Sequence, residues 1–345
     1  MAKILIISAV FAPEPVVSAK LSEDIASSLS TFNKVTVVAP KPSRPLGFKF
    51  SFERKNKKFQ IKTLKSFVCP ESDIIGRFWE SYSFGIACYR YIKNNYQDID
   101  LIYMNSWPIF SQFFSVRASI KYKIPIITHV QDLYPESLIN KMPKIRYILG
   151  FILKGIDKYV LQNSEMVIAI SQKMKDYISC TRGVEKKCIK VIQNWQDETS
   201  FIRFHTKKNY NIYSGKTHFN FMYLGNIGPV AGVELLIKAF EKANVKKSNL
   251  LIAGSGSKRK DLEKLVKKRK ILNVIFIDVP NGKVPEIQDM ADIMLLPIKK
   301  GAASSSIPSK LPAYMFSKKP IIACVDDESD TAQIIKESGS GWVIE

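Results

Sequence analysis

Short apolar runs bounded by turn residues recur along the whole chain, and stretches with helical spacing separate them. Several runs are apolar almost throughout, as in parallel strands buried on both faces. The alternation predicts an α/β fold with one doubly wound sheet in each half of the chain. The predicted strands are residues 3–8, 35–39, 101–105, 125–130, 166–171 and 189–193 in the first half, and 219–224, 249–254, 274–277, 292–297, 320–325 and 341–344 in the second.

The length of the chain, 345 residues, predicts two domains. Between residues 194 and 216 the apolar periodicity lapses into a polar stretch, so we expect a Rossmann-like domain at 1–200 and another at 201–345. In sheets of this kind, ligands bind at the carboxyl ends of the strands. We therefore expect the two domains to face each other across a cleft that is lined by loops following strands.

The composition restricts partner and compartment. An excess of 52 Lys and Arg over 31 Asp and Glu leaves a formal charge of +21, which favours an anionic partner. Five scattered cysteines without a CxxC spacing indicate neither a disulfide framework nor a zinc site, so we expect a cytoplasmic protein. The apolar run near residue 4 fits a buried strand better than a signal peptide, and since no apolar stretch reaches about 18 residues, any membrane contact is expected to be peripheral.

Two carboxylates follow the predicted strand at 125–130. Asp132 and Glu136 lie on a loop at a strand end, which makes both candidates for catalysis at the cleft. The alternative is that Asp132 caps the next helix and that Glu136 is solvated. His129 lies within the strand, and we expect it to be structural rather than catalytic.

Glycine-rich loops follow two strands of the second half. Glycines at such positions let a phosphate approach backbone N–H groups, although ordinary tight turns use the same residues. The donor-binding candidates here are Gly225, Asn226, Gly228, Gly254 and Gly256, with Asp278 following the strand at 274–277.

A loop rich in hydroxyl side chains follows the strand at 292–297 and leads to Lys310, where a helix is expected to begin. Three or more hydroxyls, free backbone N–H groups and one ammonium could together hold a diphosphate. A flexible surface loop would have a similar composition. The candidates are Ser304, Ser305, Ser306, Ser309 and Lys310.

These segments, in their order and spacing, resemble glycosyltransferase family 4, and in particular bacterial N-acetyl-L-fucosamine transferases of surface-polysaccharide synthesis. The resemblance rests on the segments 132–136, 167–171, 191–194, 225–228, 232–234, 254–256 and 307–311, with Tyr314 and Met315.

The resemblance implies a GT-B fold, in which the C-terminal domain binds a nucleotide-diphosphate sugar, here expected to be UDP-linked, and the N-terminal domain holds the acceptor. It also implies retention of the anomeric configuration, catalysis by Asp132, Glu136 and Lys310, and neither metal nor other cofactor. The implied acceptor is a lipid-linked, polyprenyl-diphosphate glycan of O-antigen or capsule synthesis.

The chain departs from the family pattern at several positions. Asn226 and Ala231 stand where many relatives carry an Arg and a Lys around the first glycine loop, so Lys310 is expected to neutralise the leaving diphosphate. A glutamate pair of the family is replaced by Ser305 and Ala313. Relatives continue beyond the position of Glu345, so a shortened C-terminal domain is expected.

The charge and motifs are also compatible with proteins that transfer no sugar. A glycosyltransferase-like binding subunit without activity would share the same loops. A nucleic-acid-binding protein is not expected, since the positive charge is spread along the chain and no recognition motif occurs.

Asp98 and Asp100 resemble a DxD metal motif, but they precede a strand, and we expect no metal site there.

Membrane contact is expected at the cytoplasmic face of the cell membrane. Residues 144–154 and 48–59 mix bulky apolar side chains with cations, which suits an anionic bilayer surface. The alternative for residues 144–154 is an amphipathic helix packed on its sheet.

Overall fold

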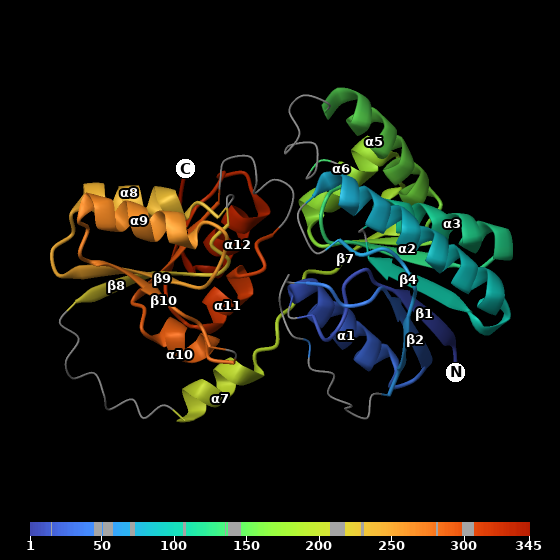
Figure 1. Ribbon diagram of the computed structural model, residues 1–345, viewed down its shortest axis with the longest axis horizontal. Helices are drawn as coiled ribbons and strands as arrows, with labels where there is room; N and C mark the ends of the chain where they lie inside the picture. Colours follow the sequence, from blue (N-terminus) through green and yellow to red (C-terminus); the bar gives the residue numbers. More distant parts are fainter. Residues whose placement is uncertain are drawn as a thin grey trace. The chain divides into compact units, whose positions relative to one another are not determined.

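The computed structural model describes residues 1–14, 16–44, 50, 58–69, 73–105, 108–134, 136, 146–207, 218–228, 231–280, 282–298 and 307–345. The chain divides into two compact units, Met1–Asn194 and Trp195–Glu345. Each unit contains one parallel sheet with helices on both of its faces (Figure 1). The division lies upstream of the boundary expected at 200/201, so helix α7 (Thr199–Lys207) belongs to the second unit.

The first unit is built on a seven-stranded parallel sheet of order β3-β2-β1-β4-β5-β6-β7. The chain starts in the middle of the sheet at β1, moves outward on one side, and then returns to build the other side from β4. The strands are β1 (Lys3–Ile7), β2 (Lys34–Ala39), β3 (Gln60–Thr63), β4 (Leu101–Asn105), β5 (Ile126–Val130), β6 (Met166–Ala169) and β7 (Ile189–Val191).

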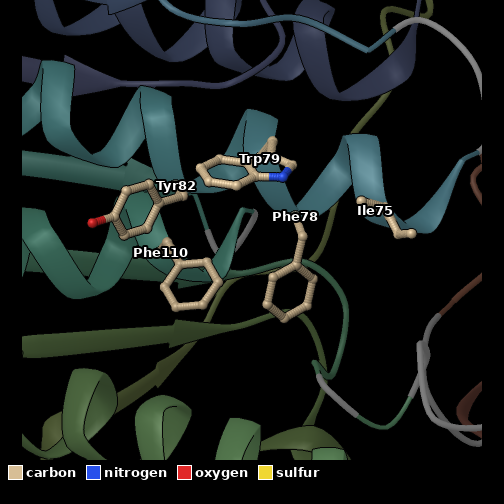
Figure 2. A pocket seen from close by; sticks show the side chains of 5 residues that line it. All are labelled: Ile75, Phe78, Trp79, Tyr82 and Phe110. Atoms are coloured by element: carbon tan, nitrogen blue, oxygen red, sulfur yellow. The ribbon is translucent and has the colours of Figure 1, made fainter.

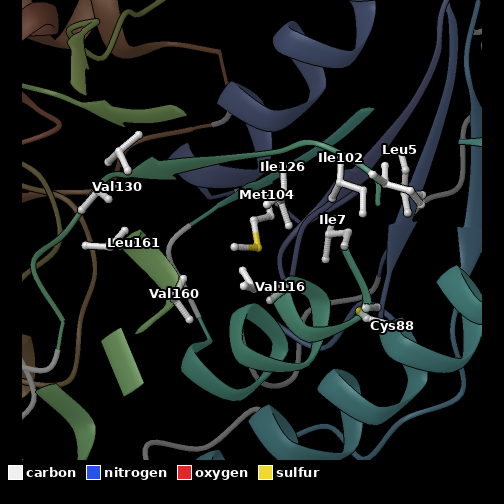
Figure 3. Packing of buried hydrophobic residues seen from close by; sticks show 14 of the residues in the cluster. Leu5, Ile7, Cys88, Ile102, Met104, Val116, Ile126, Val130, Val160 and Leu161 are labelled. Atoms are coloured by element: carbon white, nitrogen blue, oxygen red, sulfur yellow. The ribbon is translucent and has the colours of Figure 1, made fainter. Parts of the chain in front are cut away.

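Helices cover both faces of this sheet because the side chains of a strand alternate between faces. Ile4 and Ile6 of β1 pack toward α1, whereas Leu5 and Ile7 belong to the core beneath the helices of the opposite face. Figure 3 shows this second cluster, where Val116 lies among strand residues. The helices are α1 (Val17–Leu29), α2 (Ile74–Asn95), α3 (Ile109–Tyr122), α5 (Arg146–Gln162) and α6 (Gln172–Arg182), with short 3₁₀ turns at Tyr96–Asp98 and Lys186–Cys188.

Helices α2 and α3 pack closely along each other. A Cβ added to Gly85 would lie 2.6 Å from the carbonyl oxygen of Phe110, so only glycine allows this approach of the two backbones. The ring of Tyr82 meets the ring of Phe110 edge-on at a centroid distance of 6.0 Å (Figure 2).

The second unit repeats the same plan with a six-stranded parallel sheet of order β10-β9-β8-β11-β12-β13. Its strands are β8 (Phe219–Leu224), β9 (Ser248–Ala253), β10 (Val274–Ile277), β11 (Ile293–Pro297), β12 (Ile321–Cys324) and β13 (Gly341–Ile344). The strand order reverses between β8 and β11. In doubly wound sheets this reversal opens a crevice at the carboxyl edge, where ligands bind.

Two clusters of buried apolar side chains hold the second unit together. One joins α8 (Val233–Ala243) and α9 (Arg259–Arg269) to one face of the sheet, and the other joins α11 (Leu311–Phe316) and α12 (Asp330–Ser338) to the opposite face. Helix α10 (Val284–Asp289) packs against α7. Within this unit Phe201 of α7 also meets Phe316 of α11, at a centroid distance of 5.7 Å.

The predicted α/β architecture is confirmed, and each predicted strand is present with ends shifted by at most two residues. One strand, β3, was missed. All four of its side chains are exposed, and its sequence Gln-Ile-Lys-Thr lacks an apolar run, because an edge strand of this kind needs no second buried face.

The segments predicted to contact a membrane are only partly described. Residues 48–59 lie largely outside the described residues. In α5, Leu153 is buried at 1% exposure while Phe151 is 83% exposed, so the helix packs on its sheet and still presents apolar side chains outward. Within the described part of the chain, no helix is long and apolar enough to cross a bilayer.

Candidate active site

Two glycine-rich loops lie against each other at the carboxyl edge of the second sheet. The amide of Ile227 donates a 2.8 Å hydrogen bond to the carbonyl of Ser255. A Cβ on Gly254 would lie 2.1 Å from the carbonyl oxygen of Gly225, and one on Gly256 would lie 2.4 Å from that of Ile227. With φ values of +130° and +155°, Gly254 and Gly256 are therefore required for the contact between the loops, whatever else they bind.

Lys310 lies directly before α11 and extends its ammonium to the first glycine loop. Its Nζ donates a 2.8 Å hydrogen bond to the hydroxyl of Tyr223 and lies 4.5 Å from the centroid of that ring. A Cβ on Gly225 would lie 3.2 Å from the same Nζ, so the glycine leaves room for the ammonium. Lys310 and Gly225 thus meet at the point where the strand order reverses.

Burial changes the pKa values of both Lys310 and Tyr223. Burial lowers the pKa of Lys310 to about 8, and within the described ranges no carboxylate forms an ion pair with it. Burial also raises the pKa of Tyr223, which therefore stays protonated and donates its own hydrogen to the carbonyl of Asn226 at 2.7 Å. A half-buried ammonium without a counter-ion favours an anion at this position.

Helix α11 is held to the end of β8 by a buried tyrosine. The hydroxyl of Tyr314 donates to the carbonyl of Leu224 at 2.8 Å and accepts from the amide of the same residue at 2.9 Å. Leu224 precedes the glycine loop, and Lys310 precedes α11. The contact between Tyr314 and Leu224 therefore holds the loop and the lysine close to each other. Ala313 of the same helix is buried.

Asp278, a predicted donor-binding residue, follows β10 at the same edge of the sheet. Its carboxylate accepts a 2.5 Å hydrogen bond from Arg259, whose guanidinium also donates to the carbonyl of Gly254 at 2.7 Å. Arg259 therefore joins the loops that follow β9 and β10. The sequence gives no signal for this role of Arg259, because the residue lies between Lys258 and Lys260 in a run of cations typical of a solvated surface.

The remaining donor-binding candidates are placed less fully. Asn226 is exposed next to Gly228, and Ser309 is exposed directly before Lys310. Ser304, Ser305 and Ser306 lie outside the described residues. Their roles, and those of the glycines toward a donor, stay predictions.

In the first unit, Glu136 takes part in a network of charged groups. Both of its carboxylate oxygens accept from Nη2 of Arg182, at 2.8 and 2.7 Å, and one also accepts from the hydroxyl of Tyr177 at 2.9 Å. Nε of Arg182 donates to the buried Asp157 at 2.6 Å. Burial acts to raise the pKa of Glu136, but the hydrogen bonds and charge of Arg182 outweigh it and lower that pKa.

This network joins the start of the loop after β5 to α5 and α6. Arg182 is only 2% exposed and is the last residue of α6. Its role could not be predicted from the sequence, because its partners lie far away in the chain. Glu136 thus has a structural part in anchoring the loop. Its predicted catalytic part stays a prediction.

Asp132 and His129 differ in their surroundings. Asp132, two residues after β5, is exposed. His129, within β5, is buried, and its Nδ1 lies 2.5 Å from the hydroxyl of Tyr103. Burial lowers the pKa of His129 to about 4, so the ring is neutral near pH 7, as suits the structural part expected for it.

Acidic side chains do not gather into a metal site in the described ranges, where no group of three His, Cys, Asp or Glu residues could hold an ion. Asp98, of the DxD-like segment, forms a 2.7 Å ion pair with Lys3 at the amino end of β1. The carboxylate of Asp100 accepts from the amide of Lys3 at 2.7 Å. These carboxylates therefore lie at the edge of the sheet opposite to the ligand-binding edge.

Comparison with known families matches both units. Residues 23–199 match the family model described as Glycosyltransferase Family 4, and residues 206–345 match the one described as Glycosyl transferases group 1. Among curated proteins, the chain is similar to "Probable glycosyltransferase WbjE" of Pseudomonas aeruginosa, with 22% identity over 243 residues that cover 66% of this chain and 57% of that protein. It is also similar to "Putative colanic acid biosynthesis glycosyl transferase WcaI" of Escherichia coli (strain K12), with 26% identity over 204 residues that cover 54% and 47%.

The chain spans about half the length of these curated relatives. Among solved structures it is similar to Anabaena Alr3699/HepE in complex with UDP and glucose, with a TM-score of 0.67 and 15% identity over 100% of this chain and 86% of that one. It is also similar to a glycosyltransferase from Rickettsia africae ESF-5, with a TM-score of 0.64 and 13% identity over 100% of this chain and 85% of that one. With two doubly wound units of the GT-B type and a family match over more than half of its length, the chain belongs to glycosyltransferase family 4.

Proposed function

We propose that this protein is a retaining glycosyltransferase that moves a sugar from a nucleotide-diphosphate donor to a lipid-linked glycan. Its membership of glycosyltransferase family 4 supports the reaction class, and retention follows from the family resemblance. The glycine loops and the ammonium of Lys310 at the carboxyl edge of the second sheet support binding of such a donor.

The observation that carries the proposal is the position of Lys310. As the bond between the sugar and the diphosphate breaks, negative charge grows on the leaving phosphate, and a nearby cation lowers the barrier by stabilising that charge. Lys310 is an ammonium without a carboxylate partner among the described residues, and it lies against Gly225 at the switch point of the sheet. No metal is needed for this role in the proposed reaction.

For the donor we propose a UDP-linked sugar of the N-acetylated hexosamine type. Solved neighbours of the same fold contain UDP, UDP and glucose, or UDP-glucose. The N-acetylated sugar rests on the resemblance to N-acetyl-L-fucosamine transferases.

For the acceptor we propose a polyprenyl-diphosphate glycan of bacterial surface-polysaccharide synthesis, such as O-antigen or capsule, at the cytoplasmic face of the membrane. A relative named for colanic acid biosynthesis supports the polysaccharide, and the formal charge of +21 supports an anionic surface. In this proposal the exposed Asp132, after β5, orients the transferred sugar or the attacking hydroxyl.

The test begins with donor binding. We expect UDP-sugars to raise the melting temperature in a thermal-shift panel of UDP-, GDP- and dTDP-sugars, because a ligand that binds the folded state stabilises it. Release of UDP with a lipid-linked glycan fraction as acceptor then measures transfer, which we expect to persist in excess EDTA. Loss of transfer in EDTA with rescue by Mg²⁺ or Mn²⁺ would contradict the metal-free reaction.

The alternative is a glycosyltransferase-like subunit that binds a nucleotide without transferring a sugar. The alanine at position 313, where a family glutamate is expected, favours that alternative. Stabilisation by UDP without turnover on any lipid-linked acceptor would support it, and binding of a random oligonucleotide in place of UDP would contradict both.

A further inference from the structure

An apolar pocket opens on the outer side of the α2/α3 helix pair in the first unit. It has a volume of 450 Å³, and its lining residues are Ile75, Phe78, Trp79, Tyr82 and Phe110 (Figure 2). Four of these belong to α2 and one to α3. We call this surface, together with its continuation along both helices, the α2/α3 face.

The apolar part of the α2/α3 face is turned away from the sheet. Helix α2 buries Phe84, Cys88 and Ile92 in the core of the first unit. On its outer side, Ile75 is 70% exposed and Trp79 is 61% exposed. Large apolar side chains that gather on the outside of a helix pair mark a surface that binds a partner.

Cations continue the α2/α3 face toward the other end of both helices. A second hollow there is lined by Arg90 and Lys93 of α2 and by Arg117 and Lys121 of α3. In the part of the chain that the structure describes, none of the four forms an ion pair with a carboxylate. The hollow also contains Phe114, whose ring lies 5.5 Å from that of Tyr82, so the apolar and cationic parts are continuous.

We propose that the α2/α3 face docks on an anionic lipid bilayer. Ile75 and Trp79 enter the boundary between headgroups and acyl chains, and the four cations contact anionic headgroups. An apolar patch beside unpaired cations is complementary to this surface. A second copy of the chain would instead bring four further cations toward these four, and like charges in close contact oppose association.

The inference rests on the membrane-bound acceptor of the proposed function and names the surface that contacts the membrane. In a parallel sheet the connecting helices run opposite to the strands, so Ile75 and Phe110 lie toward the carboxyl edge and Lys93 and Lys121 toward the amino edge. The carboxyl edge also bears the loop that follows β5. The apolar end of the face enters the bilayer, whereas the cationic end stays at the headgroups. The side of the unit that carries Asp132 is therefore brought toward the lipid.

Vesicle binding of charge variants tests the cationic part. Each cation near an anionic surface strengthens binding about fivefold, so the Lys93→Gln/Lys121→Gln variant should bind phosphatidylglycerol-containing vesicles about 25-fold more weakly. The matched control is Lys267→Gln/Lys268→Gln, which removes the same charge from exposed positions of α9 in the second unit. Equal weakening by both double variants would overturn the proposal, because it would show that only net charge matters.

Fluorescence tests the apolar part. Vesicles with brominated acyl chains quench tryptophans that enter the bilayer, so quenching should be strong in the unmodified protein and should fall greatly in Trp79→Phe. The substitution is at an exposed position and keeps an apolar ring, so the fold should be retained. Undiminished quenching in Trp79→Phe would show that another surface inserts, and it would overturn the proposal.

Two further outcomes separate this inference from the proposed function. If Trp79→Glu abolished self-association in sedimentation but left vesicle binding intact, the α2/α3 face would be an interface between copies, and the proposal would be wrong. If the unmodified protein bound no anionic vesicles, membrane docking would fail, whereas UDP-sugar stabilisation in the same preparation would still support the transferase. We expect all these variants to keep the thermal shift produced by UDP.

Discussion

The ammonium of Lys310 donates a 2.8 Å hydrogen bond to the hydroxyl of Tyr223, although 87 residues separate them in the chain. Tyr223 lies near the end of β8, and Lys310 precedes α11. The pair brings together the two loops on either side of the reversal in strand order.

Loss of the lysine side chain should impair transfer strongly. We expect Lys310→Ala to lower kcat by on the order of 10²-fold or more, as for the loss of one donor that stabilises a developing anion. Lys318→Ala, at an exposed position beyond α11, should change kcat little and serves as the control. Steady-state release of UDP measures both, and Lys299→Ala and Lys300→Ala should also have much smaller effects. Near-native transfer and UDP affinity in a folded Lys310→Ala protein would contradict the assignment of this loop to the donor site.

The hydroxyl of Tyr223 should position that lysine. Tyr223→Phe keeps the ring near Nζ but removes both the acceptor for Lys310 and the donor to the carbonyl of Asn226. We expect UDP affinity to fall about fivefold or more, because the loss of each hydrogen bond loosens the position of the ammonium or of the glycine loop. Calorimetric titration with UDP gives the affinity, and Tyr122→Phe in the first unit is the matched control. An unchanged affinity would mean that packing alone holds Lys310 in place.

Donor binding should weaken as pH rises above 8. Burial lowers the pKa of Lys310 to about 8, so in the free protein the ammonium is present below that pH and is lost above it. At pH 9 about a tenth of the side chain is charged, and we expect UDP affinity to fall by up to about tenfold between pH 7 and pH 9. Lys310→Arg stays charged over this range, so its UDP affinity should vary much less with pH. The same steep decline in Lys310→Arg would assign the titration to another group.

The contact between the glycine loops should be sensitive to a single methyl group. In Gly254→Ala the new Cβ would meet the carbonyl oxygen of Gly225 at 2.1 Å, and we expect a loss of about 3–5 kcal/mol in the free energy of unfolding. Gly282→Ala also has a positive φ, +76°, but meets nothing within 4 Å, so it should cost only about 1–2 kcal/mol. Urea denaturation compares the two, and equal costs would show that backbone conformation alone requires glycine at position 254.

The first unit should depend on Arg182 for stability. Arg182→Ala leaves Asp157 and Glu136 without their partner in a largely buried site, and we expect the free energy of unfolding to fall by about 3–5 kcal/mol. Lys173→Ala, at an exposed position of the same helix, should change it by less than about 0.5 kcal/mol. Chemical denaturation followed by circular dichroism measures both variants. A loss below 1 kcal/mol in Arg182→Ala would show that water replaces the arginine.

Much of the fold could be predicted from the sequence because its signals are local. A strand buried on both faces needs a short apolar run, and a helix on the sheet needs an apolar stripe, so periodicity reveals both within a window of a few residues. The helix start expected at Lys310 is also confirmed, since α11 begins at Leu311. Strand β3 escaped because its exposed, polar side chains carry no such pattern.

The sequence by itself determined two doubly wound units and a loop at each strand end where a ligand can bind. It also predicted glycines and a lysine in the loops at the carboxyl edge of the second sheet, residue types that suit a close approach of backbones and an anionic ligand. Only the tertiary structure decided that Lys310 meets Tyr223, that Gly254 faces Gly225, and that Arg182 binds Glu136. Each of these contacts joins residues far apart in the chain, and their separation in space depends on strand order and on the packing of helices against the sheet, which no local pattern encodes.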